Sequence, residues 1–137
     1  MGKSQRAKGA RGELMLRDRL EELTGVKLKR NTGIQAAEGG TDLIDLDGNS
    51  VMSSWAIEVK NCETVSVNPW WKQAVEQAWE RKKRPVLFYH VPRTKRWVAV
   101  VRASEFRAAP SYSGGADDYV SMEIETFVHL MGMAKQR

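Results

Sequence analysis

Two carboxylates and a lysine are the side chains in this sequence best suited to chemistry. Asp42 ends a Gly-Gly-Thr-Asp run, and Glu58 and Lys60 flank Val59 in a short Glu-Val-Lys run. Successive side chains of a strand point to opposite faces, so Glu58 and Lys60 are expected to share one face. An acid beside an amine suits a site that a charged ligand approaches closely. It equally suits an ordinary exposed ion pair on a half-solvated strand.

A turn signal is expected to bring the three side chains together. The Asp-Gly-Asn run at 47–49 predicts a tight turn between a strand over residues 41–46 and the strand that ends at Lys60. These strands should pair antiparallel, which places Asp42 toward the same end of the sheet as Glu58.

A further carboxylate lies on a predicted helix that runs from Gly9 to Leu23, with Gly25 as its left-handed cap. Glu13 falls on the same helical stripe as the leucines at 16, 20 and 23. A buried carboxylate is costly unless it is paired or binds a cation. The alternative is an acid in the first helical turn, where the helix dipole favours negative charge.

The remaining pattern predicts an α/β fold, a mixed central sheet flanked by helices. A helix is expected over residues 69–83, with Trp71, Val75, Ala78 and Trp79 on its apolar side. Two strands that form a hairpin, a loop over 110–118 and short terminal elements follow. Most tryptophans are expected in the core, and stacking of an exposed Trp70 on a base or a partner is the alternative.

Length and composition predict one domain. The chain has 137 residues, 42% of them hydrophobic and 28% charged. The polar, basic residues 1–8 are expected to form a flexible arm, and residues 9–137 a single domain. No apolar run is long enough to span a membrane or to form a signal-peptide core. With the single cysteine Cys62, these features predict the cytoplasm of a bacterial, archaeal or phage-infected cell.

Positive charge predicts a polyanionic partner, most often nucleic acid. The net charge is +5 and the sequence pI is about 9.5. The cations cluster at the chain start and in a run at 81–84, which also suits a solvated helix end. The candidate DNA contacts from these clusters are Lys3, Arg6, Lys8, Arg11, Arg81, Lys82 and Lys83.

Paired carboxylates with a lysine predict metal-assisted hydrolysis of a phosphodiester. Mg²⁺ usually takes one or two carboxylates and keeps waters, and Asp42, Glu58 and the carbonyl of Val59 fit that demand. Mn²⁺ is expected to substitute for Mg²⁺. Protonated Lys60 can orient a water or stabilise charge on a phosphoryl transition state. The metal would activate a water and offset charge on the leaving oxygen.

The order of Asp42 and the Glu-Val-Lys run at 58–60 resembles the PD-(D/E)xK nuclease pattern. The Lys-Gly-Ala-Arg-Gly-Glu run at 8–13, followed by leucines, is similar to the start of the archaeal Holliday-junction resolvases and their phage relatives. This resemblance covers roughly residues 8–102. It implies a restriction-endonuclease-like sheet with helices on both sides, and homodimers that nick two opposed strands of a four-way junction with Mg²⁺.

The resemblance also implies roles for particular side chains. Glu13 would join Asp42, Glu58 and Lys60 in the active centre and would be a further metal ligand. Arg30 matches a basic residue near the site, and Gln73 a glutamine on the helix that follows the lysine; both are candidate DNA contacts. The serine that the family places before the aspartate is absent, and residues from about 111 onward have no counterpart.

Three functions follow from the sequence. The first is a Mg²⁺-dependent, structure-selective DNA endonuclease that resolves four-way junctions as a homodimer, in recombination and repair. The second keeps the chemistry but cuts linear, flap or single-stranded DNA, as repair or restriction nucleases do. The third is a nucleic-acid-binding module with a silent nuclease site, whose binding would weaken steeply with salt.

Overall fold

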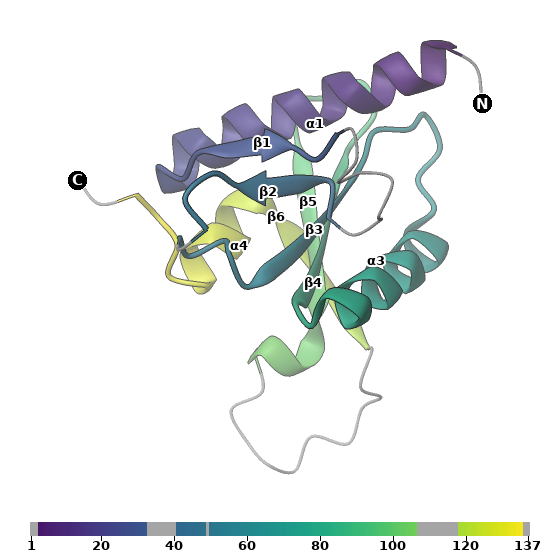
Figure 1. Ribbon diagram of the computed structural model, residues 1–137. Coiled ribbons are helices and arrows are strands. Elements are labelled where there is room, and N and C mark those ends of the chain that lie inside the picture. The colour runs from purple at the N-terminus through teal and green to yellow at the C-terminus, as the bar shows by residue number, and fades with distance from the viewer. Residues whose placement is uncertain (1–2, 33–40, 49, 107–117, 136–137) are drawn as a thin grey trace.

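The computed structural model describes residues 3–32, 41–48, 50–106 and 118–135, which form one six-stranded sheet with helices on both faces (Figure 1). The strands lie side by side in chain order. The elements are α1 (Lys3–Thr24), β1 (Leu28–Arg30), β2 (Leu43–Asp45), β3 (Trp55–Lys60), α3 (Val67–Arg81), β4 (Arg84–His90), β5 (Trp97–Arg102), the 3-10 helix η1 (Ala103–Phe106), β6 (Tyr119–Glu123) and α4 (Ile124–Leu130).

The sheet is mixed, as predicted. β3 and β4 pair in parallel, and all the remaining pairs of neighbouring strands are antiparallel. A parallel pair needs a crossover connection, and α3 supplies it. Within the described ranges, no helix is both long and apolar enough to cross a bilayer.

Alternate residues of β3 face different helices. Trp55, Ile57 and Val59 join the core that α1 and α4 cover. On the opposite face, Trp71 and Ala74 of α3 pack against residues of β4 and β5. Because both faces of β3 are covered, the Glu58 side chain is buried, with 5% of its residue surface exposed. An exposed ion pair on a half-solvated strand is therefore excluded for Glu58.

The hairpin of β2 and β3 has the predicted antiparallel pairing, with Leu43 opposite Ile57. Gly48 in the connecting turn has a φ of +75°, which glycine adopts without strain. Residues 51–54 form a turn and not an early part of β3. Strand alternation through this segment predicts Val51 on the buried side with Trp55 and Met52 on the other side; this prediction was wrong, because Val51 is exposed and Met52 is buried.

Helix α1 begins at Lys3 and not at Gly9, so residues 3–8, predicted as a flexible arm, are helical. This stretch has no apolar pattern, and its support comes from the loop after β3. Lys8 Nζ lies 2.7 Å from Glu63 Oε1, and Asn61 Nδ2 donates to the carbonyl oxygen of Lys8 at 2.9 Å. Contacts between residues so far apart in the chain leave no local signal.

Helix α3 buries Trp71, Ala74 and Ala78, which follow one stripe of the helix. The prediction that Trp79 belongs to this apolar side was wrong, because 79% of Trp79 is exposed. It lies one residue beyond Ala78 and is therefore turned by about 100° from the packed stripe.

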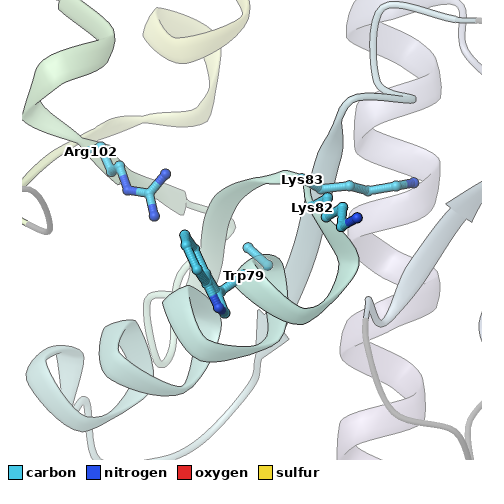
Figure 2. A pocket seen from close by; sticks show the side chains of 5 residues that line it. Trp79, Lys82, Lys83 and Arg102 are labelled. Atoms are coloured by element: carbon cyan, nitrogen blue, oxygen red, sulfur yellow. The ribbon is translucent and has the colours of Figure 1, made fainter.

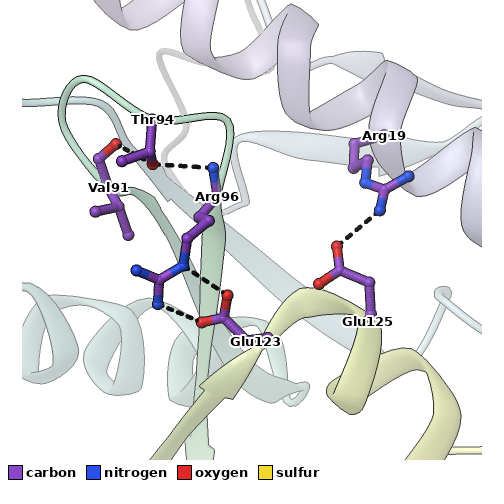
Figure 3. A network of polar contacts seen from close by, with 6 residues as sticks. All are labelled: Arg19, Val91, Thr94, Arg96, Glu123 and Glu125. Carbon is purple, nitrogen blue, oxygen red and sulfur yellow. Dashed lines mark hydrogen bonds and ion pairs between the residues drawn. The ribbon is translucent and has the colours of Figure 1, made fainter.

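Ion pairs connect elements at the surface. Arg19 of α1 bonds Glu125 of α4 at 2.7 Å, and Arg96 holds both carboxylate oxygens of Glu123 at 2.8 Å (Figure 3). Exposed pairs of this kind contribute about 0–1 kcal/mol each, so they orient elements more than they stabilise them. Arg84 bonds the more buried Glu105 and lies 3.9 Å from the ring centroid of Trp55.

Candidate active site

The structure brings Asp42, Glu58 and Lys60 together beside the end of β3. The backbone N–H of Val59 donates to Asp42 Oδ2 at 2.8 Å. Lys60 Nζ lies 3.6 Å from Glu58 Oε1, and the carboxyl groups of Asp42 and Glu58 share a hydrogen bond. The spacing of the sequence predicted this juxtaposition, which the β2–β3 hairpin produces.

The backbone around Asp42 is held from both sides. Its N–H donates to Ile57 O at 2.7 Å, and its carbonyl oxygen accepts from the N–H of Asn31 at 2.9 Å. The Asn31 side chain adds a bond to Thr41 O at 2.7 Å. The Thr41 hydroxyl accepts from the N–H of Ile57 at 2.8 Å. Asn31 and Thr41 therefore position Asp42, although neither was among the candidate site residues.

Burial raises the pKa of Glu58 well above its usual range, and repulsion by the Asp42 carboxylate adds to this, while Lys60 opposes it. Burial likewise raises the pKa of Asp42, against the N–H bond from Val59. Two adjacent carboxylates, one buried and one half-buried, cannot both ionise cheaply, so the pair retains a proton unless a cation replaces it. A divalent ion bound between the two carboxylates would supply the positive charge that lets both ionise.

The donor set fits Mg²⁺ as this chain presents it. Within the described ranges, no three His, Cys, Asp or Glu side chains form a preformed metal cluster. Mg²⁺ does not need one, since it usually takes one or two carboxylates and fills its other positions with water and substrate phosphate. Asp42 and Glu58 can supply those carboxylates. The carbonyl oxygen of Val59 stays a predicted further ligand.

Glu13 lies close enough to Asp42 for its charge to raise the Asp42 pKa. Its carboxylate is nevertheless held by Arg30, whose Nε donates to Glu13 Oε1 at 2.7 Å. This ion pair balances the charge of the half-buried Glu13 on the apolar stripe of α1. A metal-ligand role for Glu13, which would require it to leave Arg30 or to act through a water, stays a prediction.

The close approach of α1 to the site depends on Gly12. A Cβ placed there would lie 2.6 Å from the Cβ of Asn61, the residue after Lys60. On the other face, Gln73 of α3 accepts a hydrogen bond from Lys60 Nζ at 3.1 Å. Lys60 is thus held between Glu58 on its own strand and Gln73 on the covering helix.

The predicted DNA contacts divide between two ends of the sheet. Three of them lie near the carboxylates and have partners: Lys8 bonds Glu63, Arg30 bonds Glu13, and Gln73 bonds Lys60. Arg6 and Arg11 are exposed on α1. The side chain of Lys3 lies outside the described residues.

The cations at 81–83 lie at the opposite end of the sheet. Arg84, the next residue, is in register with Trp55, whereas Lys60 is in register with Tyr89. Five residues of strand, roughly 16 Å, separate these two positions. The candidate contacts therefore do not form one continuous surface.

A mixed sheet with helices on both faces, an aspartate directly before β2 and Glu-Val-Lys at the end of β3 define a nuclease of the restriction-endonuclease-like class. Residues 4–129 match the family described as "Phage putative PDDEXK endonuclease", and the chain belongs to this family. Membership implies nuclease activity on DNA. PD-(D/E)xK nucleases typically use a divalent metal.

The fold is also similar to that of a solved archaeal protein. The match is Hjc, a Holliday junction resolvase of the hyperthermophile Archaeoglobus fulgidus, with a TM-score of 0.52 and 17% identity, over 94% of this chain and 99% of that chain. At this identity the likeness establishes the fold alone, which agrees with the predicted one. No curated protein matches the chain.

Proposed function

We propose that this chain is a Mg²⁺-dependent endonuclease that cuts branched DNA, with the four-way junction as its preferred substrate. The observation that carries the chemistry is the pair of the buried Glu58 and the half-buried Asp42, with Lys60 beside it. The likeness to Hjc supports, and does not establish, a junction as the substrate.

The chain's own residues would hold and orient the reacting groups. A bound divalent ion supplies an activated water and offsets charge on the leaving oxygen. Asp42 and Glu58 would bind that ion, with the Val59 N–H fixing Asp42 through its Oδ2. Lys60, oriented by Gln73, would donate a hydrogen bond to the attacking water or to a phosphate oxygen.

Resolution of a four-way junction requires two cuts on opposed strands. The described residues contain one Asp-Glu-Lys constellation, so two chains are needed for paired cuts. We therefore propose a homodimer as the acting form. A monomer would suit a nuclease that makes single cuts in flap, linear or single-stranded DNA.

Product mapping on labelled DNA tests the substrate. Junction, flap and linear duplex of matched arm sequence are incubated with the protein, with Mg²⁺ or with chelator. The proposal predicts symmetrical paired nicks near the branch of the junction, dependent on Mg²⁺ or Mn²⁺. Faster cutting of flap or linear DNA would overturn the junction preference and leave the metal chemistry standing. Salt-sensitive binding without any product would indicate a silent module.

A further inference from the structure

A pocket at the end of α3 combines an exposed indole with positive charge. Ala78, Trp79, Lys82, Lys83 and Arg102 line it, and its volume is about 430 Å³. It lies at the end of the sheet away from the carboxylates, where α3 ends and β5 also ends. The active centre does not account for this cluster.

Trp79 is the unusual member of the cluster. The indole is 79% exposed, while Trp71 of the same helix is buried. Figure 2 shows Arg102 on one side of Trp79, with the side chains of Lys82 and Lys83 extending away on the other side. The indole therefore lies between Arg102 and the two lysines, and the described lining residues include no acid.

Lys82 occupies a position that favours glycine. It caps α3 with a φ of +57°, and its N–H bonds Ala78 O and Trp79 O. Glycine adopts this left-handed conformation with less strain than lysine. The fold therefore does not need a lysine side chain at this position.

We infer that this pocket binds an unpaired stretch of nucleic-acid strand, with one base stacked on Trp79. Base stacking on an exposed aromatic within a cationic groove is how proteins hold single strands without sequence preference. A strand lying across the indole would place the phosphates before and after the stacked base near Arg102 and the two lysines. The charge favours this occupant over an apolar protein segment.

The position of the pocket fits a strand that leaves the active centre. The strand-register separation of roughly 16 Å corresponds to about five base pairs of duplex rise. The inference rests on the proposed DNA substrate, but the binding it describes needs neither metal nor cleavage.

Binding of an oligothymidylate of about twelve nucleotides tests the inference. Affinity is measured by fluorescence anisotropy in chelator, so that no cleavage occurs, and indole emission is recorded during the titration. Trp79→Ala should weaken binding about tenfold and remove most of the emission quench. Trp79→Phe, which keeps a ring, should stay within a few-fold of the parent protein. Leu130→Ala, which removes an exposed apolar side chain of α4, is the matched control and should bind unchanged.

Lys82→Gly separates binding from folding. Glycine fits the positive φ, so the melting temperature should stay equal or rise while affinity falls and the salt slope drops by about 0.7. Wild-type affinity in Trp79→Ala would overturn the inference. So would a loss of binding that accompanies a change in oligomeric state by light scattering, since Trp79 would then belong to a protein interface. A protein that fails to cut junctions but keeps Trp79-dependent binding contradicts only the proposed function.

Discussion

At the scale of single residues, the carboxylate pair proposed to bind the metal lowers the stability of the metal-free protein. Glu58 is buried on a strand covered on both faces, and Asp42 lies against it. Such a pair is unfavourable in the protein without metal, and it becomes favourable when a cation neutralises it. Activity and stability should therefore respond in opposite directions to changes here.

Glu58→Gln should stabilise the metal-free protein at neutral pH. The native pKa of Glu58 is raised, so the folded state binds a proton that the unfolded state loses above about pH 4. Stability consequently falls as pH rises from there toward the native pKa. Removing the acid should take away the Glu58 contribution to this slope, leave the smaller contribution of Asp42, and add on the order of 1–2 kcal/mol near pH 7. Urea unfolding in chelator at several pH values measures it, and equal slopes for both proteins would contradict the pKa shift.

Gln73→Ala should slow cleavage without weakening DNA binding. Lys60 would lose the partner that orients it from α3, while its neighbour Glu58 remains. We expect a drop of about tenfold in the single-turnover rate, a modest misplacement effect. Lys72→Ala, an exposed neighbour on α3, is the control and should cut at the parent rate. A parent-like rate in Gln73→Ala would show that Lys60 needs no such support.

At the scale of elements, α1 and α3 enclose β3 and set the position of its acid and amine. Helix α1 comes close to the residue that follows β3 at a glycine, where an added Cβ would clash. Two glycines in α1 differ in their surroundings, and this difference gives a matched comparison.

Gly12→Ala should impair both folding and cleavage, whereas Gly9→Ala should stabilise. A Cβ at Gly12 meets Asn61 at 2.6 Å, and one at Gly9 has nothing within 4 Å. Overpacking costs about 1–3 kcal/mol, while alanine in an open helical position gains up to about 1 kcal/mol. Thermal unfolding and cleavage rates of the two variants check this. Equal melting temperatures would mean that Asn61 moves aside freely.

The sequence predicted the sheet, the hairpin and the juxtaposition of Asp42 with Glu58 because these follow from local signals. The Asp-Gly-Asn turn and the strand periodicity are written in neighbouring residues. The helical start at Lys3 and the bonds from Asn31 were missed because they depend on partners distant in sequence. Trp79 was assigned to the apolar side because helical periodicity does not define how wide the buried stripe is. The packing of α3 on the sheet decides which residues are buried, and it leaves Trp79 exposed.

At the scale of the whole molecule, paired nicking requires two active centres in one complex. Mixing parent protein with an excess of Glu58→Gln should yield mixed dimers that cut one strand of a junction. Nicked product should then accumulate over resolved product as the inactive variant is added, seen on denaturing and native gels of the same reaction. If the mixture only dilutes activity at a constant product ratio, the acting unit is not a dimer.

The most direct test of the proposed active centre is Mg²⁺-dependent DNA cleavage by Asp42→Asn, compared with Asp47→Asn in the same hairpin. Asp42 bonds the Val59 N–H beside Glu58, whereas Asp47 is exposed in the turn. Asp42→Asn should lose at least about a thousandfold in rate, because it removes a proposed metal ligand and its charge. Mg²⁺ should also cease to raise its melting temperature. Asp47→Asn should behave as the parent protein, and an active Asp42→Asn would contradict the assignment of the site.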